Sequence, residues 1–461
     1  MAENKSKSYS IDMCNGTILP KLLAFTIPLM FSNVLQLLFN AADIIVVGKY
    51  AGDDALAAVG SNTPLINLLT NFFLGLSIGA NVLVARYFGA KETKDAKEAI
   101  QTAMVVSVFS GLFLTLIGVL GARQILIWMS VPETVLPLST LYLRIYFLGM
   151  PACMIYNFGS AILRAIGDTR RPLYYLSFAG VINVILNLIF VIGFKLGVAG
   201  VAIATVTSQC ISAILVVRCM IKDPDVEFSL KKLTVNKKKL IMIFRIGLPA
   251  SFQGVIFAIS NVIIQASINS FGNVILAGNS AAASVEGFVY VAMNAFYQGC
   301  LSSTSQNVGA GKYERINKIL FNSLACVTVV GLILGNFANI FGRELLGFYS
   351  ESDEVIEAGL RRLSIIAVTY ALCGIMDVMV GAIRGLGYSV LPMFVSLCGA
   401  CGLRLIWIFT FFRMERFHTL ESLYYTYTVS WIVTSLVHVL CFVLIRRRMK
   451  KTANLQVISE K

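Results

Sequence analysis

Long apolar runs, separated by short polar connections, recur along the whole chain. Most have about twenty residues or more, which is enough for a helix to cross roughly 30 Å of hydrocarbon. Several runs exceed this length, so we expect some helices to tilt or to extend beyond the bilayer. The pattern predicts twelve membrane-spanning helices, near residues 22–48, 55–85, 100–121, 135–162, 173–194, 198–219, 245–270, 280–308, 319–341, 358–383, 388–412 and 422–445.

The composition is that of a membrane protein and excludes an ordinary soluble domain. Hydrophobic residues make up 57% of the 461 positions and charged residues only 13%, whereas about a quarter of a soluble domain is charged. The ten cysteines are scattered, mostly within the apolar runs, and do not form a disulfide framework. The polar start of the chain is not a cleavable signal. We therefore expect an all-α polytopic membrane protein.

The positive residues predict the orientation. If the N-terminus is cytoplasmic, most of the 38 lysines and arginines lie in cytoplasmic segments, above all in the connection 218–245. The positive-inside rule selects this arrangement, with both termini cytoplasmic in a multi-pass protein of the cell membrane. The net charge of +14 then reflects topology and contact with anionic lipid. It does not indicate a nucleic-acid partner.

The chain is also an internal duplication. A shift of 220 residues superposes Gly52 on Gly272 and Gly79 on Gly299, and it aligns LRAIGDTRRP (163–172) with IRGLGYSVLP (383–392). Six spans separate equivalent positions, so the halves insert in the same orientation and form a parallel repeat about the membrane normal. We expect a pseudo-symmetric six-helix N-lobe (1–220), a basic cytoplasmic linker (221–241), and a six-helix C-lobe with a cytoplasmic tail (242–461). Two such lobes are typical of a secondary transporter, which could work as a monomer.

Five segments in both halves resemble the multidrug and toxic compound extrusion (MATE) transporters. They are IPLMFSNVLQLLFNAADIIVVGKYAGDDALAAVG (27–60), IGANVLVARYFGAKE (78–92), GSAILRAIGDTRRP (159–172), QNVGAGKYE (306–314) and GAIRGLGYSVLP (381–392). The resemblance implies export of cationic or amphipathic small molecules, coupled to protons or sodium, by alternating access. The apolar spans and the duplication indicate only a two-lobed transporter; the reaction and the substrate class come from the resemblance.

One face of the first helix is polar. Asn33, Gln36, Asn40 and Asp43 are spaced 3, 4 and 3, so they fall within an arc of about 80°. Such a stripe should face the lobe interior or a wet cavity, where it serves either a binding site or a structural hydrogen-bond network. A buried carboxylate must be protonated or paired, which favours a proton or cation site at Asp43. The resemblance adds that MATE proteins carry an ion- and substrate-linked aspartate in this helix.

The fifth helix supplies neighbours for Asp43. Asn183 and Asn187 lie one turn apart on one face. Some MATE relatives have an aspartate where Asn187 stands, so the resemblance leaves a two-acid proton relay open to question here. An asparagine can still bind sodium through its carbonyl oxygen. We also expect Pro28 and Pro151 to bend the first and fourth helices.

The C-lobe has its own candidates, Glu286 and Asp377. Each is interpreted either as a cation site or as part of an intramembrane ion pair, with Arg404 as a possible partner. The repeat matches Asp377 with Asn157 of the fourth helix. A sodium site is conceivable at Asp43 or at Asp377. Further polar candidates in the seventh helix are Asn261 and Gln265.

Three functions are considered for a chain with these features. The favoured one is a drug/cation antiporter; the alternatives are a lipid-linked oligosaccharide flippase and a membrane-embedded enzyme. A flippase would need a central arginine and lysine cluster for a pyrophosphate, but the charges expected to be buried include three acids, Asp43, Glu286 and Asp377, against Arg144 and Arg404. GAGKY (309–313) lacks the residues of a phosphate loop, and two histidines make no recognisable metal site. We therefore expect a transporter without cofactors that binds organic cations.

Overall fold

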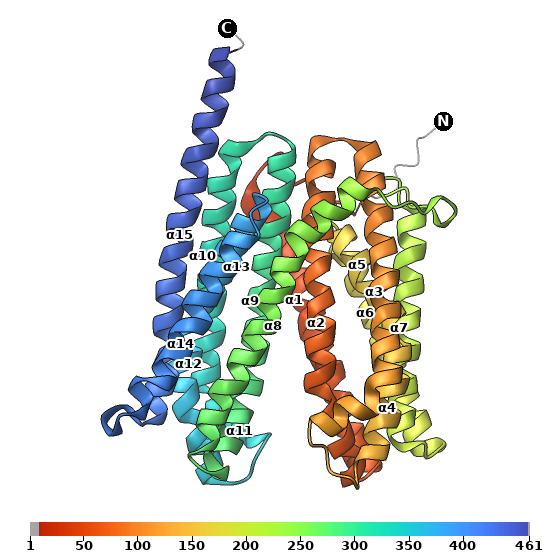
Figure 1. Cartoon of the computed structure of the whole chain (residues 1–461), viewed down its shortest axis with the longest axis vertical. Coiled ribbons are helices and arrows are strands. Elements are labelled where there is room, and N and C mark those ends of the chain that lie inside the picture. Colours follow the sequence, from red (N-terminus) through yellow and green to blue (C-terminus); the bar gives the residue numbers. More distant parts are fainter. Residues whose placement is uncertain (1–8, 460–461) are drawn as a thin grey trace. The chain divides into compact units, whose positions relative to one another are not determined.

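The structure is a computed structural model that describes residues 9–459. Within this range every regular element is helical (Figure 1). The helices of the first half are α1 (Ile18–Tyr50), α2 (Asp53–Ala90), α3 (Thr93–Trp128), α4 (Leu136–Leu148), α5 (Met150–Ala165), α6 (Arg170–Leu188), η1 (Ile189–Gly193) and α7 (Gly197–Lys222). Those that follow are η2 (Leu230–Lys232), α8 (Lys237–Asn269), α9 (Asn273–Gly309), α10 (Tyr313–Ile340), α11 (Gly342–Gly347), α12 (Asp353–Gly385), α13 (Val390–Ser396), η3 (Leu397–Gly402), α14 (Leu403–Phe409), η4 (Phe411–Arg413), η5 (Glu415–Phe417) and α15 (Leu420–Ser459).

The predicted polytopic fold is confirmed. In the described range, eleven helices or continuous helical segments are long and apolar enough to cross a membrane, and the bent pair α4 and α5 supplies a twelfth span. The two members of this pair meet at 47°. Pro151 lies in the first turn of α5 and has no N–H for the preceding turn, so the helix breaks next to it. The expected bend at Pro151 is thus present, whereas α1 continues through Pro28.

The chain folds into two compact units. Unit 1 runs from the N-terminus to Gly254 and includes the distant segment Ser305–Lys312; unit 2 contains Val255–Thr304 and the chain from Tyr313 onward. These units follow spatial contacts, whereas the predicted division at 220 and 242 follows the duplication. The lobe boundaries therefore stay a prediction.

The first part of α8 belongs to unit 1 because it packs closely on α2. A side chain at Gly75 would put its Cβ 2.5 Å from the Cα of Ser251, and one at Gly79 would lie 2.2 Å from the carbonyl oxygen of Ile243. Glycine permits this approach of two backbones. An ion pair between Lys239 and Asp95 ties the start of α8 to α3.

The C-terminal end of α9 also lies in unit 1. A Cβ at Gly89 of α2 would lie 2.0 Å from the carbonyl oxygen of Gln306, and a Cβ at Gly309 would lie 1.8 Å from that of Arg86. Gly89 and Gly309 are equivalent under the 220-residue shift, so each half contributes one glycine to the same helix contact. The glycine that both halves have at this position therefore has a packing function.

A segment before α1 secures this end of α9. The backbone N–H of Met13 donates to the side-chain oxygen of Gln306 at 3.2 Å, and the amide of Asn307 donates to the carbonyl of Met13 at 3.1 Å. The amide of Gln306 donates to the carbonyl of Ala165 at 2.7 Å. Gln306 and Asn307 of the QNVGAGKYE segment are thus held by the segment before α1 and by the C-terminal end of α5.

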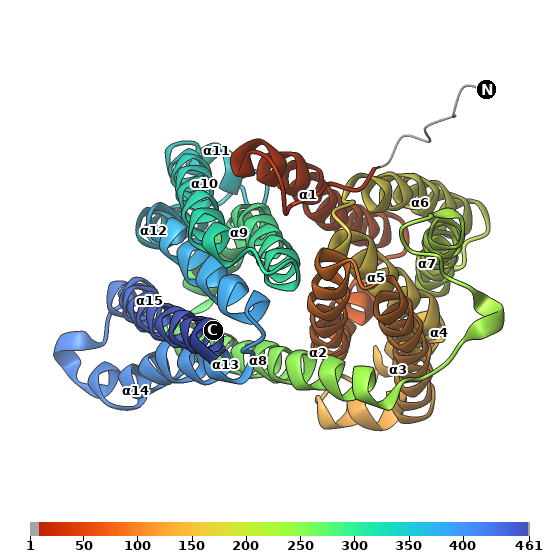
Figure 2. The same cartoon turned by 90° about the horizontal axis from the view of Figure 1, so that it is seen from above.

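Unit 1 brings α1, α6 and α7 together, with α6 beside both neighbours (Figure 2). Its interior contains two apolar clusters, one including Phe147 and Met154 and the other including Phe158 and Ile162. In unit 2, α12 packs against α10 and α15, and Gly335 approaches the carbonyl oxygen of Ala367. This packing positions the polar side chains described next.

Candidate functional site

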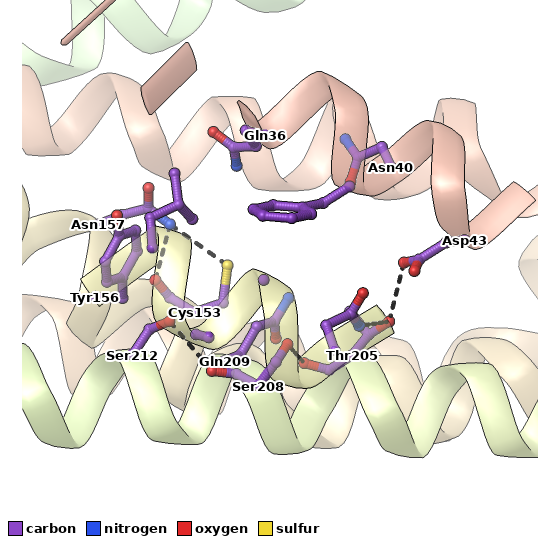
Figure 3. Close-up of a pocket in the computed structure, with 15 residues that line it drawn as sticks. Gln36, Asn40, Asp43, Cys153, Tyr156, Asn157, Thr205, Ser208, Gln209 and Ser212 are labelled. Atoms are coloured by element: carbon purple, nitrogen blue, oxygen red, sulfur yellow. Dashed lines mark hydrogen bonds between the residues drawn. The ribbon is translucent and has the colours of Figure 1, made fainter. Parts of the chain in front are cut away.

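The polar face of α1 lines a cavity of about 100 Å³ inside unit 1. Gln36, Asn40 and Asp43 all contribute to its wall, as the 3-4-3 spacing predicted (Figure 3). Asn33, one turn earlier, is half-buried and lies outside the lining. Three of the four residues predicted on this face therefore meet at one place.

The opposite wall comes from three other helices. α5 contributes Cys153, Tyr156 and Asn157, and α6 contributes Asn183. Asn157, which the repeat had matched with Asp377, donates to the carbonyl of Cys153 at 2.8 Å and faces the cavity. Polar groups from α7 complete the wall: Thr205, Ser208, Gln209 and Ser212 (Figure 3).

Asp43 is held by hydrogen bonds from α6 and α7. The amide of Asn187 donates to Oδ1 of Asp43, and the Thr205 hydroxyl lies 3.3 Å from Oδ2. The same hydroxyl lies 3.0 Å from the carbonyl of Val201, and its single proton can serve only one of these acceptors at a time. The carboxylate therefore keeps acceptor capacity for a proton or a cation.

Asn183 and Asn187 form a short network behind Asp43. Asn187 lies 3.4 Å from the side-chain oxygen of Asn183, and the Asn183 amide lies 3.4 Å from the Thr205 hydroxyl. The Oδ1 atom of Asn187 is buried and has no hydrogen-bond partner. A buried carbonyl oxygen without a donor is a natural ligand for a hard cation such as sodium.

The end of α6 explains how Asn187 reaches α1. α6 ends at Leu188, and the π-helical segment η1 begins at the next residue, Ile189. Both Asn183 and Asn187 are buried. π-Helical turns rotate the residues on either side and are frequent at functional sites. No carboxylate other than Asp43 lies in the cavity lining of unit 1, so the site carries one titratable acid.

The residues of α7 were not predicted. Thr205, Ser208, Gln209 and Ser212 are spaced i, i+3, i+4 and i+7, which puts them on one helical face. This is the same signal that identified the face of α1. Small polar residues are also common at ordinary contacts between membrane helices, so their spacing alone did not distinguish a site.

In unit 2, Glu286 forms an ion pair, and its partner is Arg362. Nε of Arg362 donates to Oε1 of Glu286 at 2.9 Å and Nη2 donates to Oε2 at 2.7 Å. Both side chains are buried. The suggested pairing of Glu286 with Arg404 is wrong, because the planar guanidinium of Arg362 already satisfies both carboxylate oxygens.

The ion pair extends into an amide network. Nη1 of Arg362 donates to Asn279 at 2.7 Å, and the amide of Asn279 donates to Gln265 at 2.9 Å. The predicted candidate Gln265 thus belongs to this network, whereas Asn261 is exposed on α8. Glu286 is neutralised within unit 2.

Arg404 has a different environment from the one suggested. Its guanidinium lies 4.1 Å from the ring centre of Tyr427 and 5.7 Å from that of Trp431, and Nε donates to the Ser430 hydroxyl at 2.9 Å. It forms no salt bridge with a described carboxylate, and its Nη2 is buried without a hydrogen-bond partner. Aromatic faces compensate part of the charge of this arginine.

Asp377 and Arg144 complete the account of the charged candidates. Asp377 of α12 is half-buried, and the Tyr290 hydroxyl contacts its carboxyl group. Arg144, which was counted among the buried charges, is exposed on α4, and its Nε donates to the carbonyl of Val119 at 3.2 Å. The count was wrong because Arg144 faces away from the interior of unit 1.

Two regions of the sequence match the MatE family, residues 28–189 and 249–410. Together they cover more than half of the chain. The chain belongs to the MatE family. The two matches reproduce the internal duplication, and MatE proteins are transporters, so this chain is a membrane transporter and not an enzyme. The predicted resemblance is confirmed.

Relatives of this MatE protein have several names. Its sequence is 29% identical over 389 residues to "Probable multidrug resistance protein YoeA" of Bacillus subtilis, covering 82% of this chain and 83% of that protein. It is 24% identical over 385 residues to a protein of Shewanella oneidensis named "FAD transporter", covering 82% and 84%. One relative is thus named for multidrug resistance and another for FAD transport.

Solved structures agree with the fold. A chain described as the "Outward-facing conformation of a multidrug resistance MATE family transporter of the MOP superfamily" superposes with a TM-score of 0.89 at 20% identity, covering 97% of this chain and 100% of that one. A MOP superfamily transporter from Pyrococcus furiosus, whose description refers to a binding pocket of reverse polarity, superposes with a TM-score of 0.88 at 22% identity and the same coverage. At these identities the likeness concerns the fold of the MatE chain.

Proposed function

We propose that the chain is a secondary active antiporter that exports cationic or amphipathic small molecules in exchange for protons or sodium by alternating access. The observation that supports this most is the environment of Asp43. Its carboxylate lies on a membrane-spanning helix, lines a polar cavity and forms no salt bridge with any described residue. A carboxylate in that position attracts one sign of charge only.

Exchange requires that ion and drug compete. When Asp43 is protonated or occupied by sodium, it no longer attracts a cationic molecule, and when it is free it does. Because the ion gradient favours occupation from one side of the membrane, the drug is released on that side. Each elementary charge that moves inward across the membrane supplies about 2.3 kcal/mol per 100 mV.

The size of the cavity separates the roles of ion and drug. Sites for drug-sized molecules have volumes of about 300–1,000 Å³, whereas the cavity beside Asp43 has about 100 Å³. It can take a sodium ion with water, or the charged end of a larger molecule. A whole drug therefore requires that α1 move away from α5 and α7.

Either coupling ion fits the oxygen atoms around Asp43. A proton needs only the carboxylate, and Asn187 can remain its hydrogen-bond donor. Sodium would use the carboxylate with the unpartnered Oδ1 of Asn187 and the hydroxyl of Thr205. Asp377, which also forms no salt bridge with a described residue, is the second place at which the ion could bind.

The proposal includes an orientation. Both termini are cytoplasmic in a cell-membrane protein that acts as a monomer, so Asn15 and Gly89 face the cytoplasm and Asn273 and Asp353 face outside. Single cysteines in a background without native thiols test this. A membrane-impermeant reagent should label a cysteine at the exposed position 273 from outside and should not label one at the exposed position 15; the reverse result contradicts the orientation.

Transport in proteoliposomes tests the function. With a fluorescent organic cation as substrate, export should accelerate when an inward proton or sodium gradient is imposed, and dissipation of that gradient should abolish the acceleration. Asp353→Asn provides a matched control, because Asp353 is an exposed aspartate of unit 2 that is not part of the cavity lining. Equal rates with and without both gradients contradict an antiporter.

One observation favours a second candidate, export of an anionic or lipid-linked molecule. Arg404 is buried, lies on Tyr427 and has an unpartnered Nη2, as a group that binds a phosphate would. A flippase for lipid-linked oligosaccharides would use such a residue. Export of a fluorescent anion that is lost in Arg404→Gln, without export of organic cations, would favour this candidate over the antiporter.

A further inference from the structure

Arg123 on α3 and Arg144 on α4 lie next to each other on the surface of unit 1. Nε of Arg144 donates to the carbonyl of Val119 at 3.2 Å, and Val119 and Arg123 are one helical turn apart on the same face of α3. Both arginines line a cavity of about 480 Å³. The other lining residues are Glu133, Leu136, Pro137, Thr140 and Leu141.

The position of this cavity along α3 puts it at the level of the lipid headgroups. α3 rises about 30 Å between Thr102, where its polar first turns end, and Arg123, which equals the thickness of the hydrocarbon core. One face of α3 before Arg123 is apolar and exposed, and it includes Leu116 and Leu120. Trp128, which follows Arg123 at the end of α3, is 74% exposed. An exposed tryptophan at this position is typical of the membrane–water interface.

The charged groups of the cavity are available for a ligand. Within the described chain, Arg123 and Glu133 make no hydrogen bond or ion pair, and only the Nε of Arg144 has a partner. The contact with Val119 orients Arg144 and leaves its two terminal nitrogens to bind. Two guanidinium groups on neighbouring helices can together hold a phosphate, which arginine recognises in bidentate geometry.

Glu133 adds a selective element. It is an exposed carboxylate on the same cavity, in the connection that follows α3 and therefore on the water side of the arginines. We propose that this cavity binds a phospholipid whose headgroup joins a phosphodiester to a primary ammonium group, with Arg123 and Arg144 on the phosphate and Glu133 on the ammonium. The exposed side chain of Leu141, which also lines the cavity, contacts the start of the acyl chains. On the orientation proposed above, this lipid lies in the outer leaflet.

Native mass spectrometry of the full-length protein in detergent tests the proposal. Dioleoyl phosphatidylethanolamine should bind severalfold better than dioleoyl phosphatidylcholine, whose quaternary ammonium cannot donate a hydrogen bond to Glu133. The double variant Arg123→Gln/Arg144→Gln should bind it about tenfold more weakly, the loss expected for charged hydrogen bonds. Glu133→Gln should keep lipid binding and lose the difference between the two lipids.

Controls keep the result interpretable. Arg343→Gln removes an exposed arginine that is already paired with Asp353 and Glu357, so its lipid binding should equal that of the wild type. Arg123 is exposed and makes no hydrogen bond or ion pair among the described residues, so Arg123→Gln alone should melt at the wild-type temperature and still bind less lipid. The proposal is wrong if the double variant binds all lipids like the wild type. Preference for dioleoyl phosphatidylglycerol, or displacement of the lipid by inorganic phosphate, would equally overturn it.

Discussion

The amide of Asn187 on α6 donates a hydrogen bond to the carboxylate of Asp43 on α1. The partner of Asp43 in this contact is an uncharged amide, and neither a second acid nor a cationic side chain. It orients Asp43 without neutralising it, because an amide carries no charge to offset the carboxylate. The charge of Asp43 is therefore available for exchange with an ion or a substrate.

Replacement of Asp43 by asparagine should abolish gradient-driven export while the protein still inserts and folds. The amide keeps the size and much of the hydrogen bonding of the carboxylate but cannot be titrated. Asp43→Glu should retain part of the export, because its carboxylate reaches a similar position. Dye export from proteoliposomes measures both. Wild-type rates and unchanged proton and sodium dependence in Asp43→Asn would assign this carboxylate a structural role and direct attention to Asp377.

Asn187→Asp should create a pair of carboxylates in hydrogen-bond contact. Two like charges at this distance cannot both be ionised easily, so the pair should retain one proton to higher pH than a single carboxylate does. We expect the pH at which export is half-maximal to rise by about one unit or more. The measurement is the export rate as a function of external pH at constant membrane potential. An unchanged profile would show that Asn187 does not influence coupling.

Arg362→Met should destabilise the protein by about 3–5 kcal/mol, because it leaves the buried carboxylate of Glu286 without its partner. Under the 220-residue shift, Glu286 and Arg362 correspond to Ile66 and Tyr142, which belong to one apolar cluster of unit 1. The double variant Glu286→Ile/Arg362→Tyr should therefore recover most of the stability. Thermal unfolding in detergent compares the variants. A double variant as unstable as Arg362→Met would contradict the prediction.

Gly89→Ala should weaken the contact between α2 and the end of α9, since the new methyl group would lie 2.0 Å from the carbonyl oxygen of Gln306. Backbone cannot move aside as a flexible side chain does, so we expect a loss of about 1–3 kcal/mol and a lower melting temperature. Gly60→Ala in the same helix is the control: nothing lies within 4 Å of its Cβ position. That variant should be neutral or stabilised by about 0.5–1 kcal/mol.

Asp12 should stabilise the segment before α1 in a pH-dependent manner. Burial raises the pKa of its carboxyl, but hydrogen bonds from Asn15 and the backbone of Cys14, with the charge of Lys21, lower it below its usual value. A lowered folded-state pKa means that the stabilisation is present above about pH 4 and is lost as the pH falls through that pKa. The melting temperature of Asp12→Asn should thus lie below that of the wild type at pH 6, and the difference should be smaller at pH 3. A difference that is the same at both pH values would exclude this contribution.

The sequence predicted the spans and one wall of the cavity because both depend on periodicity. Asn40 and Asp43 share a face of α1 by their spacing alone, and the same holds for Asn183 and Asn187 on α6. The relation between the two helices is a matter of packing, so the spacing indicated neighbours without giving the contact from Asn187 to Asp43.

The sequence missed the role of Arg362 and placed Arg144 wrongly, and in both cases the direction of a long side chain is the reason. Arg362 lies near the N-terminal end of its predicted span, beside Arg361, and was not among the predicted site residues, yet its side chain is buried against Glu286. Arg144 lies well inside its span and faces outward. A position along an apolar run does not fix the direction of a long side chain, since both the bend at Pro151 and neighbouring helices decide which face is covered.

The ion pair of Glu286 and Arg362 also bears on the ancestry of the chain. Duplication produced two halves that began alike, but the positions equivalent to this pair now hold Ile66 and Tyr142. Conversely, Asn187 corresponds under the 220-residue shift to Trp407. Near the start of each half the shift is 221 residues, which pairs Pro28 with Pro249 and Asp43 with Ile264. Ile264 and Trp407 both pack in an apolar cluster of unit 2. Each half therefore has a polar pair at positions where the other half has residues of an apolar cluster. The two halves differ in how they hold these charges: Asp43 is bound by uncharged donors, whereas the carboxylate of Glu286 is neutralised by Arg362.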